Sequence, residues 1–114
     1  MGLIEIQKKT EFDDLLKSHQ FVLVDASASW CGPCKAISPF FEKHAAENDH
    51  LSDKVAFLKF DTDDVPDLAQ ELGIRSIPTF FLFEGGELVD SLSGANPPRL
   101  QQLCQTAVAK AQGS

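Results

Sequence analysis

The sequence predicts one α/β domain in which a mixed β-sheet lies between helices. Strand-like and helix-like segments alternate along the first half of the chain, which is typical of a βαβ unit. Two strand-like segments joined by a glycine turn then precede a last helix, which adds a hairpin to that unit. The 114 residues suit a single domain, spanning 1–114, that buries its own core. We expect about five strands flanked by about four helices.

The first predicted elements are an edge strand, a helix and a buried strand. Leu3–Ile6 alternates apolar and polar residues, as a short edge strand does. Thr10 and Asp13 resemble an acidic variant of the capping box and predict the start of a helix. Phe21–Val24 is continuously apolar, which indicates a central strand covered on both faces.

A long helix is expected from about residue 33 to about residue 48. Pro33 fits its first turn, because the N–H that proline lacks would have no partner there. Pro39 lies inside the helix and should kink it, since no N–H is left to bond the carbonyl four residues back. Phe40 and Phe41 are expected to pack inward from the kinked part.

A second buried strand and a second helix of the unit follow. Val55–Phe60 is expected to be another central strand, and the acidic turn Asp61–Asp64 ends it. Leu68 and Leu72 mark one side of the next helix, and Gly73 suits its C-terminal cap.

A hairpin and a terminal helix complete the predicted domain. Phe80–Phe83 and Leu88–Ser93 flank a turn that contains Gly85 and Gly86. The last helix is expected to start near Asn96. Its apolar stripe has helical spacing and comprises Leu100, Leu103, Cys104, Ala107 and Val108.

Composition restricts the partner and the compartment. The formal net charge of -7 argues against a nucleic-acid partner, because binding a polyanion needs a basic face. No stretch approaches the ~20 apolar residues of a membrane span, and no cationic flank leads into an apolar run of signal-peptide length. Three cysteines, an odd number, fit a reducing compartment better than a secreted disulfide framework. We therefore expect a cytoplasmic protein.

A CxxC pair, Cys31 and Cys34, stands where a buried strand should end and a helix begin. Two intervening residues place the Cα atoms on the order of 5 Å apart, within the range that a disulfide tolerates. So small a loop removes little chain entropy, which favours a bond that opens and closes over one that stabilises the fold. The alternative is half of a zinc site. No second CxxC is present, and the histidines are not at ligand spacing: His19, His44 and His50.

The sequence assigns different roles to the two sulfurs. Cys31 precedes the helix, where unpaired N–H groups and the helix dipole stabilise a thiolate, so we expect it to attack. Cys34, one turn into the helix, is expected to be more shielded and to resolve the mixed disulfide. Asp25 is the odd residue in an apolar run, and burial would raise its pKa toward the range useful for proton transfer. The alternative for Asp25 is an ordinary solvated carboxylate at a strand end.

Three segments resemble the thioredoxin family. The string WCGPCK, residues 30–35, follows an apolar run that ends in Asp25, as it does in that family. Residues 73–79, GIRSIPT, resemble the family's proline-bearing loop, and residues 93–96, SGAN, resemble its last loop. The resemblance covers nearly the whole chain in the right order, and it implies the thioredoxin fold.

The resemblance also implies roles for residues around the cysteines. In thioredoxins the acid that matches Asp25 helps to deprotonate the second cysteine, here Cys34, through water. Bacterial members pair this acid with a Lys at the position of Phe57, so the resemblance supplies no direct Lys partner. The Ile77–Pro78 bond is expected to be cis, and the residue before the proline to offer backbone groups to an extended substrate. The implied docking surface comprises Trp30, Gly32, Pro33, Ile77, Pro78, Gly94 and Ala95.

The function that the resemblance implies is general protein-disulfide reduction, with a part in electron transport and cell redox homeostasis. The chain would cycle between the Cys31/Cys34 dithiol and their disulfide, bind no cofactor and act as a monomer. Protein disulfides would be its substrates, and an NADPH-dependent thioredoxin reductase would recharge it. One alternative is a disulfide isomerase or oxidase domain, which usually carries His in place of Pro33 and needs an export signal. Another is a binding subunit with the thioredoxin fold, which the intact cysteines oppose.

Two further features have structural interpretations. Cys104 lies on the apolar stripe of the last helix and is expected to be a buried small hydrophobe, the alternative being a regulatory or dimer-forming thiol. An acidic cluster is expected to form a solvated turn, and its charge would suit a basic partner. Its members are Asp61, Asp63, Asp64 and Asp67.

Overall fold

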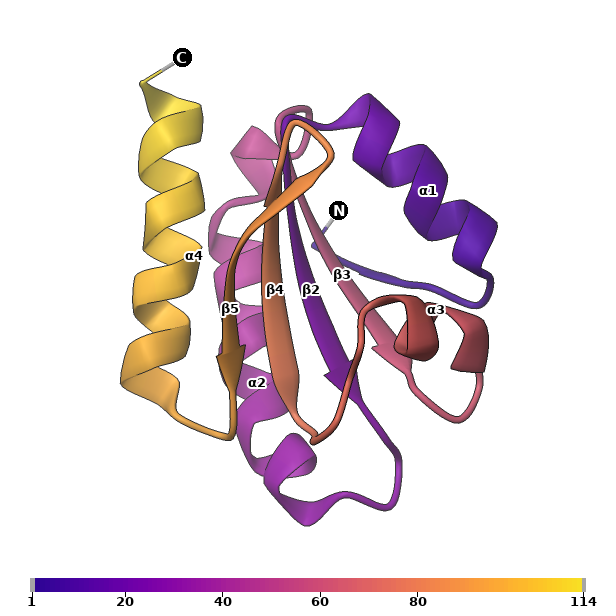
Figure 1. Ribbon diagram of the computed structural model, residues 1–114. Coiled ribbons are helices and arrows are strands. Elements are labelled where there is room, and N and C mark those ends of the chain that lie inside the picture. The colour runs from indigo at the N-terminus through magenta and orange to yellow at the C-terminus, as the bar shows by residue number, and fades with distance from the viewer. Residues whose placement is uncertain (1, 114) are drawn as a thin grey trace.

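The computed structural model describes residues 2–113, which form a five-stranded sheet flanked by four helices (Figure 1). The predicted fold class is confirmed, and the end residues of the predicted domain, 1 and 114, lie outside the described part. In chain order the elements are β1 (Leu3–Glu5), α1 (Lys9–Ser18), β2 (Phe21–Ser27), α2 (Gly32–Glu47), the 3-10 turn η1 (Asp49–Leu51), β3 (Val55–Asp61), α3 (Pro66–Glu71), β4 (Thr79–Glu84), β5 (Glu87–Ser93) and α4 (Pro97–Gln112).

The strands lie in the spatial order β1, β3, β2, β4, β5. The first three are parallel, whereas β4 pairs antiparallel with β2, and β5 antiparallel with β4. The carboxyl ends of β2 and β3 therefore lie at the same end of the sheet as the amino end of β4. The connections β2–α2, α3–β4 and β5–α4 gather there, at the lower end of the molecule in Figure 1.

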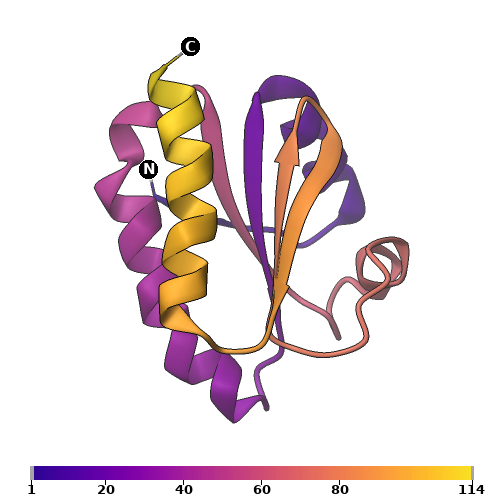
Figure 2. The ribbon, with the colours of Figure 1, turned by 60° about the vertical axis from the view of Figure 1, so that its left-hand side comes forward.

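Helices cover both faces of the sheet, α2 and α4 on one face and α1 and α3 on the other (Figure 2). Phe21 and Leu23 of β2 belong to the core under α2 and α4. Val22 and Val24 belong to the core on the opposite face. Burial on both faces accounts for the continuous apolar run. Asp25 continues the first series, so its side chain lies on the face that α2 covers.

The start of α1 differs from the prediction. Glu11 closes the first turn, because its Oε1 accepts the backbone N–H of Lys8 at 2.8 Å. Asp13 instead accepts hydrogen bonds from Lys9 Nζ at 3.0 and 3.3 Å. The capping box predicted at Thr10 is therefore wrong: Glu11 accepts the N–H of Lys8, which is the N-cap, so the helix starts two residues sooner.

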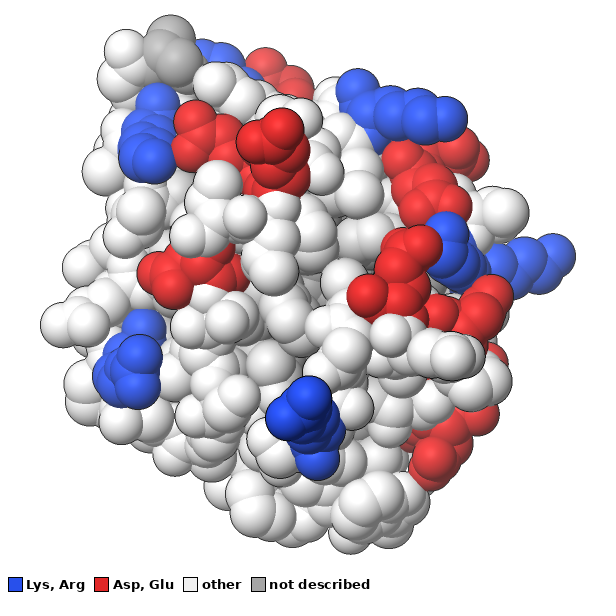
Figure 3. Space-filling view, in the orientation of Figure 1, with Lys and Arg blue, Asp and Glu red and all other residues white. Residues whose placement is uncertain are grey.

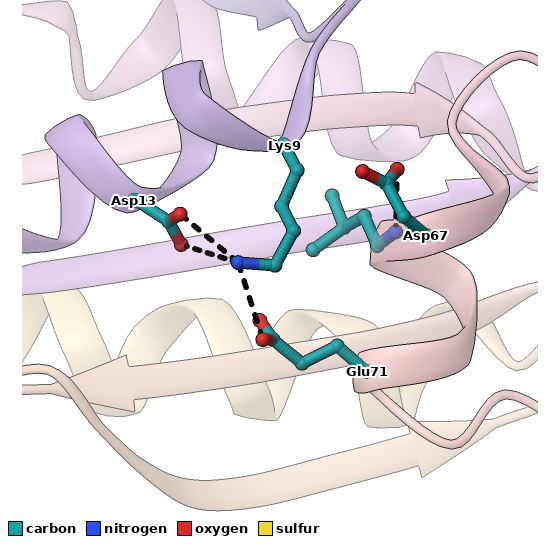
Figure 4. A network of polar contacts seen from close by, with 5 residues as sticks. Lys9, Asp13, Asp67 and Glu71 are labelled. Atoms are coloured by element: carbon teal, nitrogen blue, oxygen red, sulfur yellow. Dashed lines mark hydrogen bonds and ion pairs between the residues drawn. The ribbon is translucent and has the colours of Figure 1, made fainter.

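Lys9 also links α1 to α3. Its Nζ lies 3.0 Å from Asp13 Oδ2 and 3.2 Å from Glu71 Oε1 (Figure 4). The hydrogen bonds to these two carboxylates raise the pKa of the Lys9 ammonium. Beside them, Asp67 Oδ1 accepts the N–H of Leu68 at 2.9 Å. Partly exposed ion pairs add little stability, so the fully buried Leu68 side chain is the stronger attachment of α3.

The two phenylalanines of α2 face different ways. Phe41 is fully buried, whereas 46% of Phe40 is exposed. Consecutive helical residues point about 100° apart, so both rings cannot face the sheet. The prediction that Phe40 packs inward is therefore wrong. Pro39 lies inside α2 as expected, and the kink stays a prediction.

The last elements agree with the sequence patterns. Gly85 and Gly86 join β4 to β5 with φ of +61° and +83°, the left-handed conformation that a tight two-residue hairpin turn needs. Asn96 caps α4, because its side-chain oxygen accepts the N–H of Arg99 at 3.2 Å. The predicted stripe of α4 enters the core, with Val108 only partly buried. Its buried members are Leu100, Leu103, Cys104 and Ala107.

Candidate active site

Cys31 and Cys34 are joined by a disulfide at the start of α2. Their Cα atoms lie 5.3 Å apart, as the CxxC spacing predicts. The backbone N–H of Cys34 donates a hydrogen bond to Cys31 Sγ at 3.2 Å, so this sulfur caps the helix. An N–H donor and the positive end of the helix dipole act on the same atom. Both favour a thiolate at Cys31 once the disulfide is reduced.

Burial does not distinguish the two cysteines. Cys31 is 5% exposed and Cys34 is 3% exposed, and both pack with Ala28 and the partly buried Ile77. The feature that separates the sulfurs is the helix start, where only Cys31 receives the capping N–H. Within residues 2–113, no three His, Cys, Asp or Glu side chains gather as metal ligands would.

The Asp25 side chain is withdrawn from solvent. It is 1% exposed, and its Oδ1 has no hydrogen-bond partner among the described residues. Burial raises the pKa of Asp25 from 3.8 to about 7. The alternative interpretation, a solvated carboxylate at a strand end, is therefore wrong. A carboxyl group with this pKa can take up and release a proton near neutral pH.

Two charged side chains act on Asp25 in opposite directions, each more weakly than burial. Lys59 lies directly across from Asp25 in the register of β2 and β3, and its charge lowers the pKa of Asp25. Glu42 of α2 raises this pKa. The position that resemblance singles out, Phe57, instead packs edge-on against Phe41, with ring centroids 5.6 Å apart. The signal that would have indicated Lys59 is strand alternation, which puts positions 57 and 59 on one face.

A hollow of about 470 Å³ reaches the second cysteine. Cys34 and Lys59 line it, together with Ser38 of α2 and Glu5 of β1. Its volume is many times that of one water molecule. Cys34 and the lysine opposite Asp25 therefore line the same hollow.

The proline-bearing loop contacts both the cysteines and the last loop. The Ile77–Pro78 peptide bond is cis. Ile77 packs on the cysteines, and the Pro78 carbonyl accepts the N–H of Gly94 at 2.9 Å. Gly94 has a φ of +97°, a conformation that glycine adopts without strain. Three members of the predicted docking surface thus lie together at the disulfide end of the sheet.

The other four members of that surface are exposed. They are Trp30, Gly32, Pro33 and Ala95. The lower part of the molecule in Figure 3, where the three loops lie, carries few charged side chains. The surroundings of the disulfide are therefore largely uncharged on this face.

Sequence reasoning missed two acidic partners of the loop before Cys31. Trp30 Nε1 donates a hydrogen bond to Asp63 Oδ2 at 2.8 Å. The N–H of Ser29 donates to Asp61 Oδ2 at 3.0 Å. Both acids belong to the cluster interpreted as a solvated turn. The strand order could have indicated these contacts, because residues that follow adjacent parallel strands, here β2 and β3, lie at the same end of a sheet.

Cys104 belongs to the core, as predicted. It is 1% exposed and packs among the apolar residues under α2 and α4. Burial raises the pKa of the Cys104 thiol to about 12. A protonated, buried thiol is a poor nucleophile, so this environment disfavours a part for Cys104 in the exchange chemistry.

Comparison with known proteins agrees with this geometry. The family model described as Thioredoxin matches residues 3–106. The chain belongs to the thioredoxin family. It is 53% identical over 103 residues to Thioredoxin-2 of Pyricularia oryzae, a match that covers 90% of this chain and 58% of that protein. It is 38% identical over 104 residues to a thioredoxin of Coprinus comatus, covering 91% of this chain and 96% of that one.

A solved structure of Plasmodium falciparum thioredoxin has the same fold, with a TM-score of 0.81 and 36% identity over 90% of this chain and 97% of that chain. Family membership and the bonded cysteine pair identify a thiol–disulfide oxidoreductase that reduces protein disulfides. Over the part of the chain that the structure describes, no helix has the length and apolar character of a membrane span.

Proposed function

We propose that this protein is a general protein-disulfide reductase in which Cys31 attacks the substrate and Cys34 resolves the mixed disulfide. The observation that carries this assignment is the hydrogen bond from the Cys34 N–H to Cys31 Sγ, at 3.2 Å. The thiolate is the nucleophile in disulfide exchange, so the sulfur that the helix start stabilises is the one that attacks.

Each cycle moves two electrons from the chain to the substrate, which also takes up two protons, one that Cys34 loses and one from solvent. The Cys31 thiolate bonds to one sulfur of the substrate disulfide, and the other substrate sulfur leaves as a thiolate. Cys34 then loses its proton and attacks Cys31 Sγ. The Cys31–Cys34 bond forms, and the second substrate sulfur leaves. Both leaving sulfurs take up protons, and the chain remains in the oxidised state described here.

Asp25 is the proposed proton acceptor for Cys34. Its pKa of about 7 suits transfer at neutral pH. The hollow lined by Cys34 leaves room for water beside this sulfur, which supports proton transfer through water. Lys59 lies opposite Asp25 on β3, and its positive charge favours the carboxylate that must accept the proton.

The proposed docking surface surrounds the disulfide. An extended substrate segment would bond to backbone groups of the residue before the cis proline, Ile77, in the manner of an added strand. The contact between Pro78 and Gly94 supports this proposal because it holds two loops of the surface together. The scarcity of charge on this face supports a broad substrate range, since charge is a main source of specificity between partners.

The proposed electron donor is a thioredoxin reductase that draws on NADPH, and the proposed compartment is the cytoplasm, where a monomer would serve electron transport and redox homeostasis. Family membership supports the donor. The chain contains a free thiol, Cys104, as well as the CxxC disulfide, and this combination supports a reducing compartment. Fractionation of cells that express the tagged full-length protein checks the compartment, and recovery with mitochondria or in the medium would contradict it.

One reconstituted assay tests the activity. The chain is mixed with NADPH, a thioredoxin reductase and a disulfide-bonded protein, and NADPH absorbance is followed. We expect many turnovers per chain, and none when the Cys31→Ser variant replaces it. Consumption of one NADPH per chain would show recharging without transfer to the protein substrate. If chemical dithiols reduce the chain's disulfide but the thioredoxin reductase does not, the proposed electron donor is wrong.

A further inference from the structure

Trp30 is an exposed ring with a fixed polar end. The residue is 69% exposed and adjoins the attacking Cys31. Packing therefore restrains the indole little. Its Nε1, however, donates a hydrogen bond of 2.8 Å to Asp63 Oδ2 on the turn after β3. A carboxylate acceptor makes this bond stronger than one between neutral groups.

Asp63 is itself held in place. Its backbone N–H donates to Asp61 Oδ1 at 2.8 Å, and Asp61 Oδ2 accepts the N–H of Ser29 at 3.0 Å. Ser29 is the chain neighbour of Trp30. Hydrogen bonds and this backbone link therefore join four residues in a closed cycle: Ser29, Trp30, Asp61 and Asp63. A further hydrogen bond, from the Thr62 N–H to the Ser27 carbonyl at 2.9 Å, joins the ends of β3 and β2 next to these residues.

We propose that Asp63 is a positioning residue for protein substrates, because it holds the Trp30 ring in one orientation on the docking surface. This inference rests on the docking surface proposed above. An unrestrained indole would lose side-chain entropy when a substrate covered it, and that loss would weaken binding. A ring already fixed by Asp63 avoids most of this cost. Asp63 thus lowers the substrate concentration needed for exchange without touching the sulfurs.

A competing explanation is that Asp63 acts only through its charge, by attracting basic partners. The chain supplies a matched control, since Asp64 is exposed, acidic and next in sequence. Asp63→Ala and Asp64→Ala remove the same charge from the same turn. Only Asp63→Ala removes the acceptor of the Trp30 hydrogen bond. Asp63→Asn removes the charge but keeps an acceptor oxygen.

Single-turnover kinetics with the pre-reduced chain make the test independent of any reductase. The oxidation rate is followed against the concentration of a disulfide-bonded protein, and separately of a small aromatic disulfide. For Asp63→Ala we expect the half-saturating protein concentration to rise roughly three- to tenfold, the usual effect of one lost hydrogen bond. The maximal rate and the rate with the small disulfide should stay within about twofold. Asp64→Ala should match the parent, and Asp63→Asn should recover most of the loss.

Two further measurements report on the ring itself. Trp30 is the chain's single tryptophan, so its fluorescence anisotropy is unambiguous and should fall in Asp63→Ala but not in Asp64→Ala. Trp30→Phe keeps an aromatic ring but has no N–H to donate. Adding Asp63→Ala to Trp30→Phe should therefore change the half-saturating concentration no further.

The outcomes separate the positioning role from the docking surface. An equal rise in Asp64→Ala, or a full effect of Asp63→Ala in the Trp30→Phe background, would overturn the positioning role. If Trp30→Ala raises the half-saturating concentration but Asp63→Ala does not, positioning fails and the docking surface stands. If Trp30→Ala leaves protein exchange unchanged, the docking surface fails, and positioning fails with it.

Discussion

Lys59 lies directly opposite Asp25 on the neighbouring parallel strand, and both side chains are on the face of the sheet that α2 covers. Burial nevertheless affects the pKa of Asp25 more than the attraction to Lys59 does, and the pKa is therefore raised to about 7. Desolvation favours the neutral acid, and the ammonium favours the carboxylate. The proton affinity of Asp25 is therefore set by groups that do not react.

Substitutions of the two charged neighbours should move this pKa in opposite directions. Lys59→Gln removes the stabilising charge and is expected to raise the pKa of Asp25, whereas Glu42→Gln is expected to lower it. Titration of the Asp25 carboxyl carbon by NMR measures both shifts. Lys43→Gln is the matched control, since it removes a charge from the exposed side of the same helix as Glu42. Shifts of the same sign in both variants would contradict the balance.

Asp25→Asn should change how stability depends on pH. The pKa of Asp25 is about 7 in the folded chain and near 3.8 in an unfolded one, so the folded state holds its proton more tightly. Below about pH 4 both states are protonated and the group has no effect. As the pH rises toward 7, ionisation favours the unfolded chain, and about 4 kcal/mol of stability is lost.

The variant cannot ionise at this position, so its advantage over the parent should grow between about pH 4 and about pH 8. Urea unfolding of the oxidised parent and variant at about pH 4 and about pH 8 measures this difference in stability. If the free energies of unfolding of parent and variant depend on pH in the same way, Asp25 has the same pKa in the folded and unfolded chain.

The Asp25→Asn variant should also reduce disulfides more slowly than the parent at neutral pH, because Cys34 loses its proton acceptor. If the rate of disulfide reduction is unchanged in the variant, Asp25 is not the proton acceptor.

Single-cysteine variants separate attack from resolution. Cys34→Ser is expected to trap substrates as stable mixed disulfides, since nothing remains to release them, and Cys31→Ser is expected to trap almost none. Non-reducing gels of each variant incubated with a disulfide-bonded protein display the adducts. Trapping of similar amounts by both variants would refute the assignment of roles.

Cys104→Ala should leave reductase activity unchanged and remove roughly 1 kcal/mol of stability, because only a small cavity replaces the sulfur. In the oxidised protein Cys104 is the free thiol, so alkylation reports on it directly. We expect slow labelling in buffer and fast labelling in urea. Fast labelling of the native protein would show a thiol that opens to solvent.

Features with local causes were predictable from the sequence. Phe21–Val24 indicated a strand covered on both faces, and Gly85 with Gly86 indicated a tight hairpin turn, because each depends only on adjacent residues. The position of Cys31 just before a helix follows in the same way from the strand before it and Pro33 after it. These patterns supplied the fold class and the reacting pair.

Features that depend on register or on contacts between loops were not predictable. Placing Lys59 opposite Asp25 requires the pairing of β2 and β3 to the residue, since a slip of one position turns the lysine to the other face. The bond between Trp30 and Asp63 joins loops 33 positions apart. The sequence indicated an acidic turn, but its composition did not indicate toward which residues the carboxylates point.

The sulfur that caps α2 makes oxidation and folding two steps of one thermodynamic cycle. The first turn of the helix contacts Cys31 Sγ, and that atom changes from a neutral bonded sulfur to a thiolate on reduction. By linkage, the amount by which the folded helix start stabilises the dithiol state more than the disulfide state equals the amount by which it favours reduction of the disulfide. A substitution that loosens only this turn therefore alters how readily the chain gives up electrons, although it touches neither sulfur.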